Sequence, residues 1–409
     1  MLPEIVQANY IGNHTLSIQP SNRTQRVKPS PTLAVTALAG QLRAEGRDVI
    51  GLAAGEPDFD TPEHVKQAAI RAIQDGHTKY TAVDGTAGLK QAIINKFDKE
   101  NGLHYAADQI LVSVGGKQVF YNLVQALLNP GDEVIIPAPY WVSYPDMVML
   151  ADGEPVIVSG DIKQAFKISA AQLEAAITPK TRLVVINSPS NPSGKAYTRA
   201  ELSALAEVLL RYPDIVVITD DIYEHIVWTD EGFNNILNVC PELQSRTLVL
   251  NGVSKAYSMT GWRIGYAGGP AELIKGMKKV QSQSTSNPCS IAQYAAQAAL
   301  EGDQDFLKQM CDVFKQRHDY VYKRLLAMPG VECLASDGTF YSFPSFQGVI
   351  DRMTGIKNDI ELAQLLLEKA EVALVPGSAF GADGHLRLSF ATSMENLEKA
   401  LDRIAKTID

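Results

Sequence analysis

The chain has 409 residues, of which 45% are hydrophobic and 20% are charged, and its formal net charge is −9. This length and composition allow two domains, or one large domain with a smaller partner, around a sizeable hydrophobic core. The acidic balance gives no electrostatic footprint for nucleic acid or for an anionic membrane surface, so we expect neither as a partner.

The spacing of the cysteines favours a reducing compartment, and the hydropathy favours a protein without a membrane span or signal peptide. The four cysteines lie far apart without a C-x-x-C pair, which argues against a disulfide framework and against structural zinc, and we expect no metal. No apolar run approaches the roughly 18 residues of a membrane span. Residues 1–20 lack the basic and apolar regions of a signal peptide. The sequence therefore predicts a cytoplasmic protein.

The N-terminal part of the chain begins with an arm, predicted over residues 1–30, that shows no clear period. Helical patterning follows over residues 32–46, and residues 49–62 are typical of a strand that breaks into a turn. Thr61 and Pro62 are predicted to be the N-cap and the first residue of a helix that runs to residue 76.

From about Gln109 onward, short apolar runs alternate with helical patterns, one of which opens with a possible capping box between Thr198 and Glu201. The runs are continuously apolar, as expected of strands that are buried on both faces. Seven strands are predicted, at residues 109–114, 132–137, 154–159, 182–187, 214–220, 246–251 and 264–269. This order predicts an α/β fold in which helices sandwich a mostly parallel seven-stranded sheet.

From about residue 305 the pattern changes to a long helix over 306–328, followed by short strands and two further helices. We predict a smaller α+β domain here. The predicted division of the chain is an arm at 1–30, a large domain at 61–305, and a small domain formed by 31–60 and 306–409.

The segment from Asn251 to Tyr266 carries Lys255 and Arg263 eight residues apart, directly after a predicted strand. A lysine whose pKa is lowered in a pocket is a nucleophile toward an aldehyde, and an arginine fork is suited to a phosphate. An aldehyde-bearing, phosphorylated cofactor indicates pyridoxal phosphate (PLP). Read alone, a loop lysine is more often simply solvated, but three other segments supply further parts of such a site.

Gly115, Gly116 and Lys117 follow a strand and open a helix, where backbone N–H groups and the helix dipole favour an anion; a tight packing turn is the alternative. Trp141 follows the next strand and offers an aromatic face for a cofactor ring, or simply packs in the core.

Two strand ends carry polar residues at the edge of the sheet where ligands bind in open α/β folds. Asn191 is positioned to donate to the phenolate oxygen of PLP, although the segment also reads as an ordinary turn. Asp220 is suited to keep the pyridine nitrogen protonated, with a capping aspartate as the alternative, and Tyr223 is suited to contact the same phenolate oxygen. For His225 we favour a satisfied or surface histidine.

Near the C-terminus, Arg387 alternates with apolar residues on a predicted strand. An arginine that points from a small domain into a cleft is suited to an α-carboxylate. The alternative is a salt bridge on an edge strand.

Together these segments resemble the fold-type I PLP enzymes, and among them the class I aminotransferases of the aspartate family. The resemblance covers nearly all of the chain through the motifs KPSPT, AGEPDFDTPEHVK, TKYTAVDG, VGGKQ, PYWVSYP, NSPSNPSG, DDIYEH, SKAYSMTGWRIGY and RLSFATS. It implies that Lys255 binds PLP covalently and exchanges the proton during transfer, that Asp220 pairs with the pyridine nitrogen, and that Asn191 and Tyr223 contact the phenolate oxygen.

The resemblance also implies the remaining roles. The phosphate would be held by Arg263, Ser254, Gly115, Gly116 and Lys117, and the ring by Trp141. The substrate carboxylate would be held by Gly55 and Arg387, with Trp141 and Asn191 also touching the substrate. Tyr80 matches a tyrosine that reaches the phosphate of the neighbouring subunit, which implies a homodimer with shared active sites.

Two departures from the animal-type enzymes bear on specificity. Gly252 stands where those enzymes carry a serine, which matches the bacterial subgroup, and the arginine that binds their distal carboxylate is not found. In the bacterial subgroup that task falls to Lys117, with Ser30 and Thr32. The prediction is an aspartate aminotransferase that moves an amino group between aspartate or glutamate and 2-oxo acids by a ping-pong mechanism.

Other activities use the same scaffold, because a fold does not decide a reaction. The alternatives are a prephenate or aromatic aminotransferase and a C–S lyase. A cofactor-sensing regulator would need an added DNA-binding domain, for which the arm is too short.

Overall fold

The structure, a computed structural model, describes residues 18–29 and 31–409. Most of the predicted arm, and Ser30, lie outside the described residues. The described part of the arm contains a short helix, α1 (Asn22–Gln25). Arg23 in this helix and Arg26 directly after it form ion pairs with Asp152 at 2.6 and 2.5 Å.

All seven predicted strands are present and form one sheet. They are β2 (Ile110–Ser113), β3 (Glu133–Ala138), β4 (Glu154–Ser159), β5 (Thr181–Asn187), β6 (Val216–Asp220), β7 (Thr247–Gly252) and β8 (Gly265–Gly268). Their order in the sheet is β2-β8-β7-β6-β5-β3-β4, and only β8 runs antiparallel to its neighbours. The prediction of a mostly parallel seven-stranded sheet is confirmed.

The expectation that every strand is buried on both faces is wrong for β4. This strand lies at the edge of the sheet, where Glu154, Ile157 and Ser159 are exposed and Pro155, Val156 and Val158 are half-buried. A continuous apolar run does not reveal which strand ends up at an edge.

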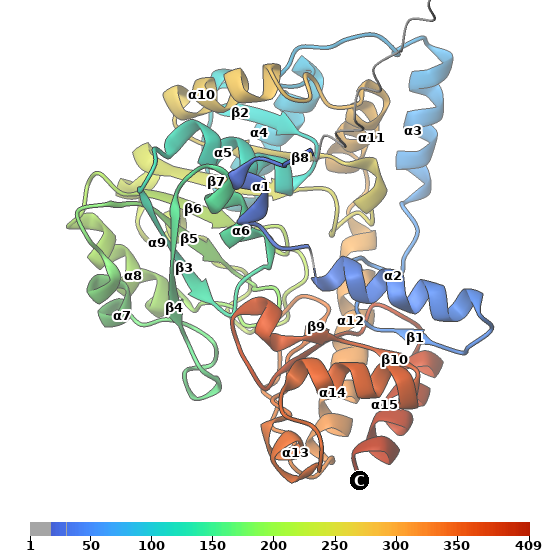
Figure 1. Cartoon of the computed structure of the whole chain (residues 1–409). Helices are drawn as coiled ribbons and strands as arrows, with labels where there is room; N and C mark the ends of the chain where they lie inside the picture. The colour runs from blue at the N-terminus through green and yellow to red at the C-terminus, as the bar shows by residue number, and fades with distance from the viewer. Residues whose placement is uncertain (1–17, 30) are drawn as a thin grey trace, which may run out of the picture.

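Helices cover both faces of the sheet (Figure 1). Along each strand, alternate side chains enter two separate cores; Ile218 lies in one and Val217 in the other. The first core packs against α5 (Gly116–Leu127), α6 (Ser143–Leu150) and α10 (Ala271–Ser282). The second packs against α4 (Ala87–Asn101), α7 (Ala170–Ala176), α8 (Arg199–Leu210), α9 (Ile236–Val239) and α11 (Ser290–Glu301), with α3 (Glu63–Gln74) lying on α11.

The two predicted helix starts have different outcomes. The capping box before α8 is confirmed, because Thr198 Oγ1 accepts from the Glu201 N–H at 3.2 Å and the Glu201 carboxylate accepts from the Thr198 N–H at 2.8 Å. The predicted Thr61 N-cap is wrong: α3 begins at Glu63, after Pro62. The Thr61 hydroxyl instead donates to the Ser258 carbonyl at 2.8 Å.

A second region contains the C-terminal part of the chain and the segment before α3. Its elements are α2 (Pro31–Ala44), β1 (Ile50–Gly51), α12 (Asp305–Leu326), β9 (Tyr341–Ser342), α13 (Gln347–Arg352), α14 (Asp359–Leu365), β10 (Val372–Ala373), β11 (Val375–Pro376), β12 (Leu386–Ser389) and α15 (Met394–Ile408). Strands β11, β12 and β9 form an antiparallel sheet, and β1 pairs in parallel with β10. In Figure 1 the blue helix α2 accordingly lies beside the red elements of the C-terminal part.

Short turns of other helix types complete the described chain. The 3₁₀ turns are Ala107–Gln109, Ile162–Gln164, Pro241–Arg246, Thr260–Trp262 and Gly377–Phe380, and a π turn, Leu366–Ala370, continues α14. None of the described helices is both long enough and apolar enough to cross a membrane. The predicted domain limits stay a prediction.

Candidate active site

A cavity of about 400 Å³ lies where the carboxyl ends of β5 and β6 and the turn after β7 face the second region. This volume is within the usual range for small-molecule sites, about 300 to 1,000 Å³. Predicted site residues from both regions line it, namely Thr32, Gly55, Gly116, Lys117, Trp141, Asn191, Asp220, Tyr223, Ser254, Lys255, Arg263 and Arg387.

Three predicted residues are not part of the lining. Gly115 lies directly behind it, against Arg263. Tyr80 is 92% exposed and does not line the cavity of its own chain. Ser30 lies outside the described residues.

Lys255 occupies the turn after β7, and its ammonium donates to the carbonyl oxygen of Gly55. Burial lowers the pKa of Lys255 to about 8, with the positive charge of Arg387 acting in the same direction. An amine with this pKa has a much larger neutral fraction near physiological pH than an ordinary lysine, although the ammonium form still predominates below pH 8. The lowered pKa is the property that a lysine needs to act as a nucleophile or to exchange a proton.

The glycine turn before α5 packs closely against Arg263. Gly115 has φ +83°, and a Cβ on it would lie 2.2 Å from Nη2 of Arg263, so only glycine lets the guanidinium approach. Arg263 donates to the carbonyls of Thr260 at 2.8 Å and Val114 at 3.2 Å, which holds the side chain beside the first turn of α5. The packing alternative also holds here, because Gly265 approaches the Gly115 backbone equally closely.

Asp220 ends β6 as a buried carboxylate. Tyr144 Oη donates to its Oδ2 at 2.5 Å, and the Ile222 N–H donates to Oδ1 at 3.3 Å, which is a local turn bond rather than a helix cap. Burial raises the pKa of Asp220 to about 6. Among the described residues, no cationic side chain forms an ion pair with this carboxylate, so a cation in the cavity would be its natural partner.

Asn191 and Tyr223 lie in the loops after β5 and β6. Asn191 Oδ1 accepts from Arg387 Nη1 at 2.9 Å. The Tyr223 hydroxyl lies 3.1 Å from that of Tyr341. The segment around Asn191 does form a turn, with the Gly194 N–H donating to the Ser190 carbonyl, so the turn alternative and a binding role coexist.

Arg387 is 2% exposed and lies on β12, the middle strand of its sheet. The predicted alternative of an edge-strand salt bridge is therefore wrong. Nη2 donates to the Ala53 carbonyl at 2.6 Å, the guanidinium stacks 4.4 Å from the ring centre of Tyr341, and Nε is buried without a hydrogen-bond partner.

A buried cation that lacks an anionic partner is costly. In the described part of the chain, no carboxylate lies within ion-pair distance of Arg387, and burial lowers its pKa. This arrangement is what a site for an external carboxylate requires.

Lys117 is a further cationic group that lines the same cavity, in addition to Lys255, Arg263 and Arg387. Lys117 Nζ lies 5.2 Å from the ring centre of Trp141. Burial lowers the pKa of Lys117, and the nearby Arg263 charge adds to that effect. Thr32 contributes a buried hydroxyl that has no hydrogen-bond partner among the described residues.

Sequence reasoning missed two tyrosines of the site. Tyr144 stands three residues after Trp141 in the motif PYWVSYP, and Tyr341 stands in the segment GTFYSF of the C-terminal part. The motif around Tyr144 was an available signal, but neither segment reveals the partner of its tyrosine.

His225 is a satisfied histidine, as predicted, because it bonds to Glu100 at 2.9 Å. With Glu224, these residues form the one group of metal-ligand types found in the described ranges. The ammonium of Lys96 already contacts both carboxylates, so the cluster reads as an ion-pair network.

Comparisons with known proteins agree with this geometry. The family model for aminotransferase class I and II matches residues 47–404. The chain is 59% identical over 393 residues to an aspartate/prephenate aminotransferase of Nitrosomonas europaea, covering 95% of this chain and 99% of that protein.

Two solved structures are similar throughout. An aspartate aminotransferase from Rhizobium meliloti has a TM-score of 0.93 at 52% identity, covering 96% of this chain and 99% of that one. An aspartate aminotransferase from Thermus thermophilus with maleate has a TM-score of 0.90 at 44% identity, covering 96% of this chain and 100% of that one.

Proposed function

Because the chain belongs to the aminotransferase class I and II family, whose members use PLP, we propose that it is an aspartate aminotransferase. It transfers the amino group between aspartate or glutamate and 2-oxo acids by a ping-pong mechanism. The observation that carries this proposal is Arg387, a buried cation without an anionic partner in a cavity that also holds Lys255 and Asp220.

The cavity fits PLP at three points. The Gly115–Gly116 turn, Arg263 and Ser254 would hold the phosphate at the N-terminus of α5. Asp220, a buried carboxylate without a cation, would pair with the pyridine nitrogen. Trp141 would cover the ring.

When bound, PLP withdraws electrons from the α-carbon of the substrate. The protein supplies the other parts of the reaction. Lys255, whose amine has a pKa of about 8, accepts and returns the α-proton. Arg387 and Asn191 orient the α-carboxylate, and Tyr223 donates a hydrogen bond to the phenolate oxygen of PLP.

Preference for acidic substrates would come from Lys117 and Thr32. The lysine brings a further positive charge to the cavity, and the threonine hydroxyl has no partner among the residues described. A distal carboxylate would pair with both groups, since buried polar atoms favour partners. The alternative role for Lys117 is to serve the cofactor phosphate.

The test is a panel of amino donors against 2-oxoglutarate and oxaloacetate with purified enzyme and saturating PLP. We expect aspartate and glutamate to give the highest kcat/KM. Turnover of aromatic donors alone would overturn the assignment. Release of sulfide or pyruvate from cysteine conjugates, without amino transfer, would indicate a C–S lyase.

A second candidate is amino transfer to prephenate. Two relatives, at 59% and 56% identity, are named aspartate/prephenate aminotransferases, and prephenate carries carboxylates that Arg387 and Lys117 are suited to bind. Adding prephenate to the acceptor panel tests this activity, and a kcat/KM close to background would remove it.

We also propose a homodimer with shared active sites in the cytoplasm. Tyr80 is 92% exposed, as expected of a side chain that reaches a partner. Mixing an inactive Tyr80 variant with an inactive Lys255 variant should restore activity in hybrid dimers, and a monomer by light scattering would contradict the proposal.

The four free cysteines suit a reducing compartment, which cell fractionation would test.

A further inference from the structure

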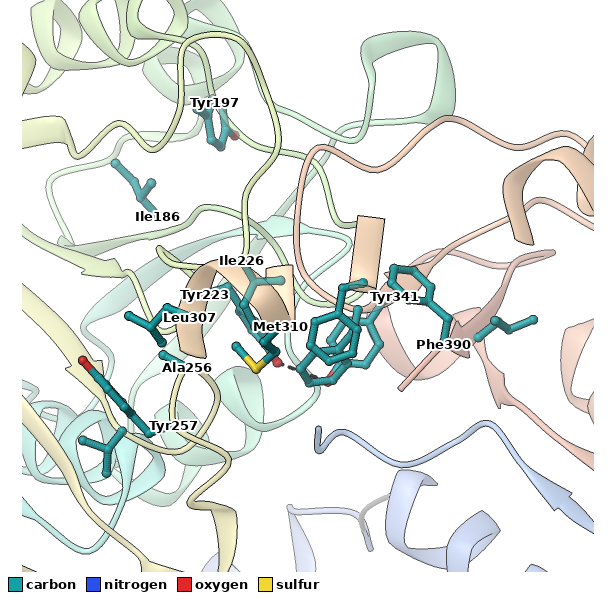
Figure 2. Close-up of a cluster of buried hydrophobic side chains, with 14 of the residues drawn as sticks. Ile186, Tyr197, Tyr223, Ile226, Ala256, Tyr257, Leu307, Met310, Tyr341 and Phe390 are labelled. Carbon is teal, nitrogen blue, oxygen red and sulfur yellow. Dashed lines mark hydrogen bonds between the residues drawn. The ribbon is translucent and has the colours of Figure 1, made fainter. Parts of the chain in front are cut away.

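Tyr341 brings the second region of the protein into contact with the site on the large sheet. It lies on β9, paired antiparallel with Ser389 of β12, and is completely buried. Figure 2 shows Tyr341 and Tyr223 in the same buried cluster, near Met310 and Phe390. The two tyrosines come from distant parts of the sequence and meet only in the folded protein.

Three elements of the site converge on this one side chain. The hydroxyl lies 3.1 Å from the hydroxyl of Tyr223 and 2.9 Å from the position that a Cβ on Gly55 would occupy. The ring lies 4.4 Å from the guanidinium carbon of Arg387. A larger residue at Gly55 would therefore displace the hydroxyl, and a smaller one at position 341 would remove the nearer of the two aromatic rings beside the guanidinium, the other being Phe380 at 5.0 Å.

The number of hydroxyl protons decides which tyrosine donates in this contact, once Tyr223 donates to another acceptor. Each phenol has one proton. When Tyr223 donates to an oxygen in the cavity, its own oxygen is left as an acceptor, and Tyr341 becomes the donor. Burial raises the pKa of both Tyr223 and Tyr341, and the Arg387 charge opposes that rise at both hydroxyls, so the proton count alone decides which one donates.

We propose that Tyr341 is a positioning residue with two separable tasks: its hydroxyl donates to Tyr223 and strengthens the hydrogen bond that Tyr223 gives to PLP, and its ring holds Arg387 in place for the substrate carboxylate. This inference rests on the proposed function, because it assigns Tyr223 to the phenolate oxygen and Arg387 to the carboxylate. Through Tyr341 the second region would help to set the pKa of the bound cofactor, and through Arg387 it would help to bind the substrate.

The hydroxyl is tested with Tyr341→Phe, which removes one oxygen and keeps the ring. A hydrogen bond donated to the phenolate oxygen stabilises its negative charge. It therefore lowers the pKa of the Lys255 nitrogen when PLP is bound to it. Weakening that bond should raise the titration midpoint of the bound cofactor's visible absorption by roughly 0.4 to 1 pH unit. Tyr105→Phe is the matched control, because Tyr105 has a buried hydroxyl without a partner and does not line the cavity.

The ring is tested with Tyr341→Leu and maleate, a dicarboxylate that has no amino group to transfer. Loss of a desolvated cation–π contact should weaken maleate binding by roughly 10- to 30-fold, whereas Tyr341→Phe should bind maleate as wild type does. Circular dichroism confirms that each variant is folded.

An unchanged titration midpoint in Tyr341→Phe, or equal maleate affinity in the Leu and Phe variants, would overturn the corresponding task. Neither readout requires turnover of aspartate. An enzyme that rejects aspartate as a donor but shows both effects would refute the proposed substrate and retain this inference.

Discussion

Replacing Arg387 with lysine keeps a positive charge and removes the planar fork. In the structure the fork is held on several sides: Nη1 donates to Asn191 and Nη2 to Ala53, and the plane stacks on Tyr341, while Nε has no hydrogen-bond partner. A lysine ammonium is a point charge that cannot reproduce these contacts together with a bidentate grip on a carboxylate. Loss of such a charge-assisted pair in a closed site costs about 2 to 5 kcal/mol, which corresponds to roughly 30- to 5,000-fold in kcat/KM.

The assay is kcat/KM for aspartate with 2-oxoglutarate, measured with saturating PLP for wild type, Arg387→Lys and Arg387→Ala. A matched control is Arg317→Lys, because Arg317 is also a buried arginine but already has a carboxylate partner, Asp58, at 2.7 and 2.9 Å. We expect the control to lose stability and to keep kcat/KM close to wild type.

Equal kcat/KM in wild type and Arg387→Lys would refute the assignment and place the carboxylate elsewhere in the cavity. A parallel fall in cofactor occupancy, measured by absorbance, would also contradict it, because the proposal assigns Arg387 to the substrate carboxylate and assigns the cofactor phosphate to Arg263 and the Gly115–Gly116 turn.

Lys255→Ala should bind PLP weakly through Arg263 and lose amino transfer by several orders of magnitude; borohydride reduction of wild type followed by peptide mapping should place the label on Lys255, and a label on another lysine would contradict this. Asp220→Asn should abolish turnover and stabilise the cofactor-free protein. The sign follows from the raised pKa of about 6: between about pH 4 and 6 the folded carboxyl binds more protons than the unfolded chain, so stability falls as pH rises. Thermal melts should show the variant more stable at pH 7 by up to about 3 kcal/mol, with the difference vanishing toward pH 4, and a pH-independent difference would refute the reasoning. Lys117→Ala should lower kcat/KM for aspartate more than tenfold relative to phenylalanine, because an exposed charge pair contributes at most about 1 kcal/mol and a desolvated one more; an equal fall for both donors would favour the aromatic alternative.

The seven strands of the large sheet were predictable because each is marked by a short run of apolar residues in the sequence. Buried strands of a parallel sheet need continuous apolar runs, and each of the seven runs forms a strand. The capping box at Thr198 is similarly short-range, since both of its bonds join residues three apart. The motif residues in the cavity were also predicted, because they follow strand ends and parallel strands bring those ends together.

The remaining features depend on contacts that no local pattern contains. Tyr223 and Tyr341 are 118 residues apart, and their contact exists only after the two regions pack. The exposure of β4 follows from its position in the sheet order, which its own sequence does not encode. Thr61 has the composition of an N-cap, but its hydroxyl bonds to Ser258 in the turn after Lys255. The hydrogen bond with Ser258, which exists only in the folded protein, therefore takes the place of an N-cap interaction by Thr61.

The pairing of β1 with β10, Ile50 with Val372 and Gly51 with Ala373, has a consequence for biosynthesis. All strands of the large sheet leave the ribosome before β10 does, so that sheet is able to form while the segment around β1 still waits for its partner. Gly55 follows β1, and Arg387 and Tyr341 belong to the late part of the chain. A nascent chain therefore completes the contact of Arg263 with the Gly115 turn before Tyr341 and Arg387 join the cavity, and a polypeptide stopped before β12 would lack the proposed site for the α-carboxylate.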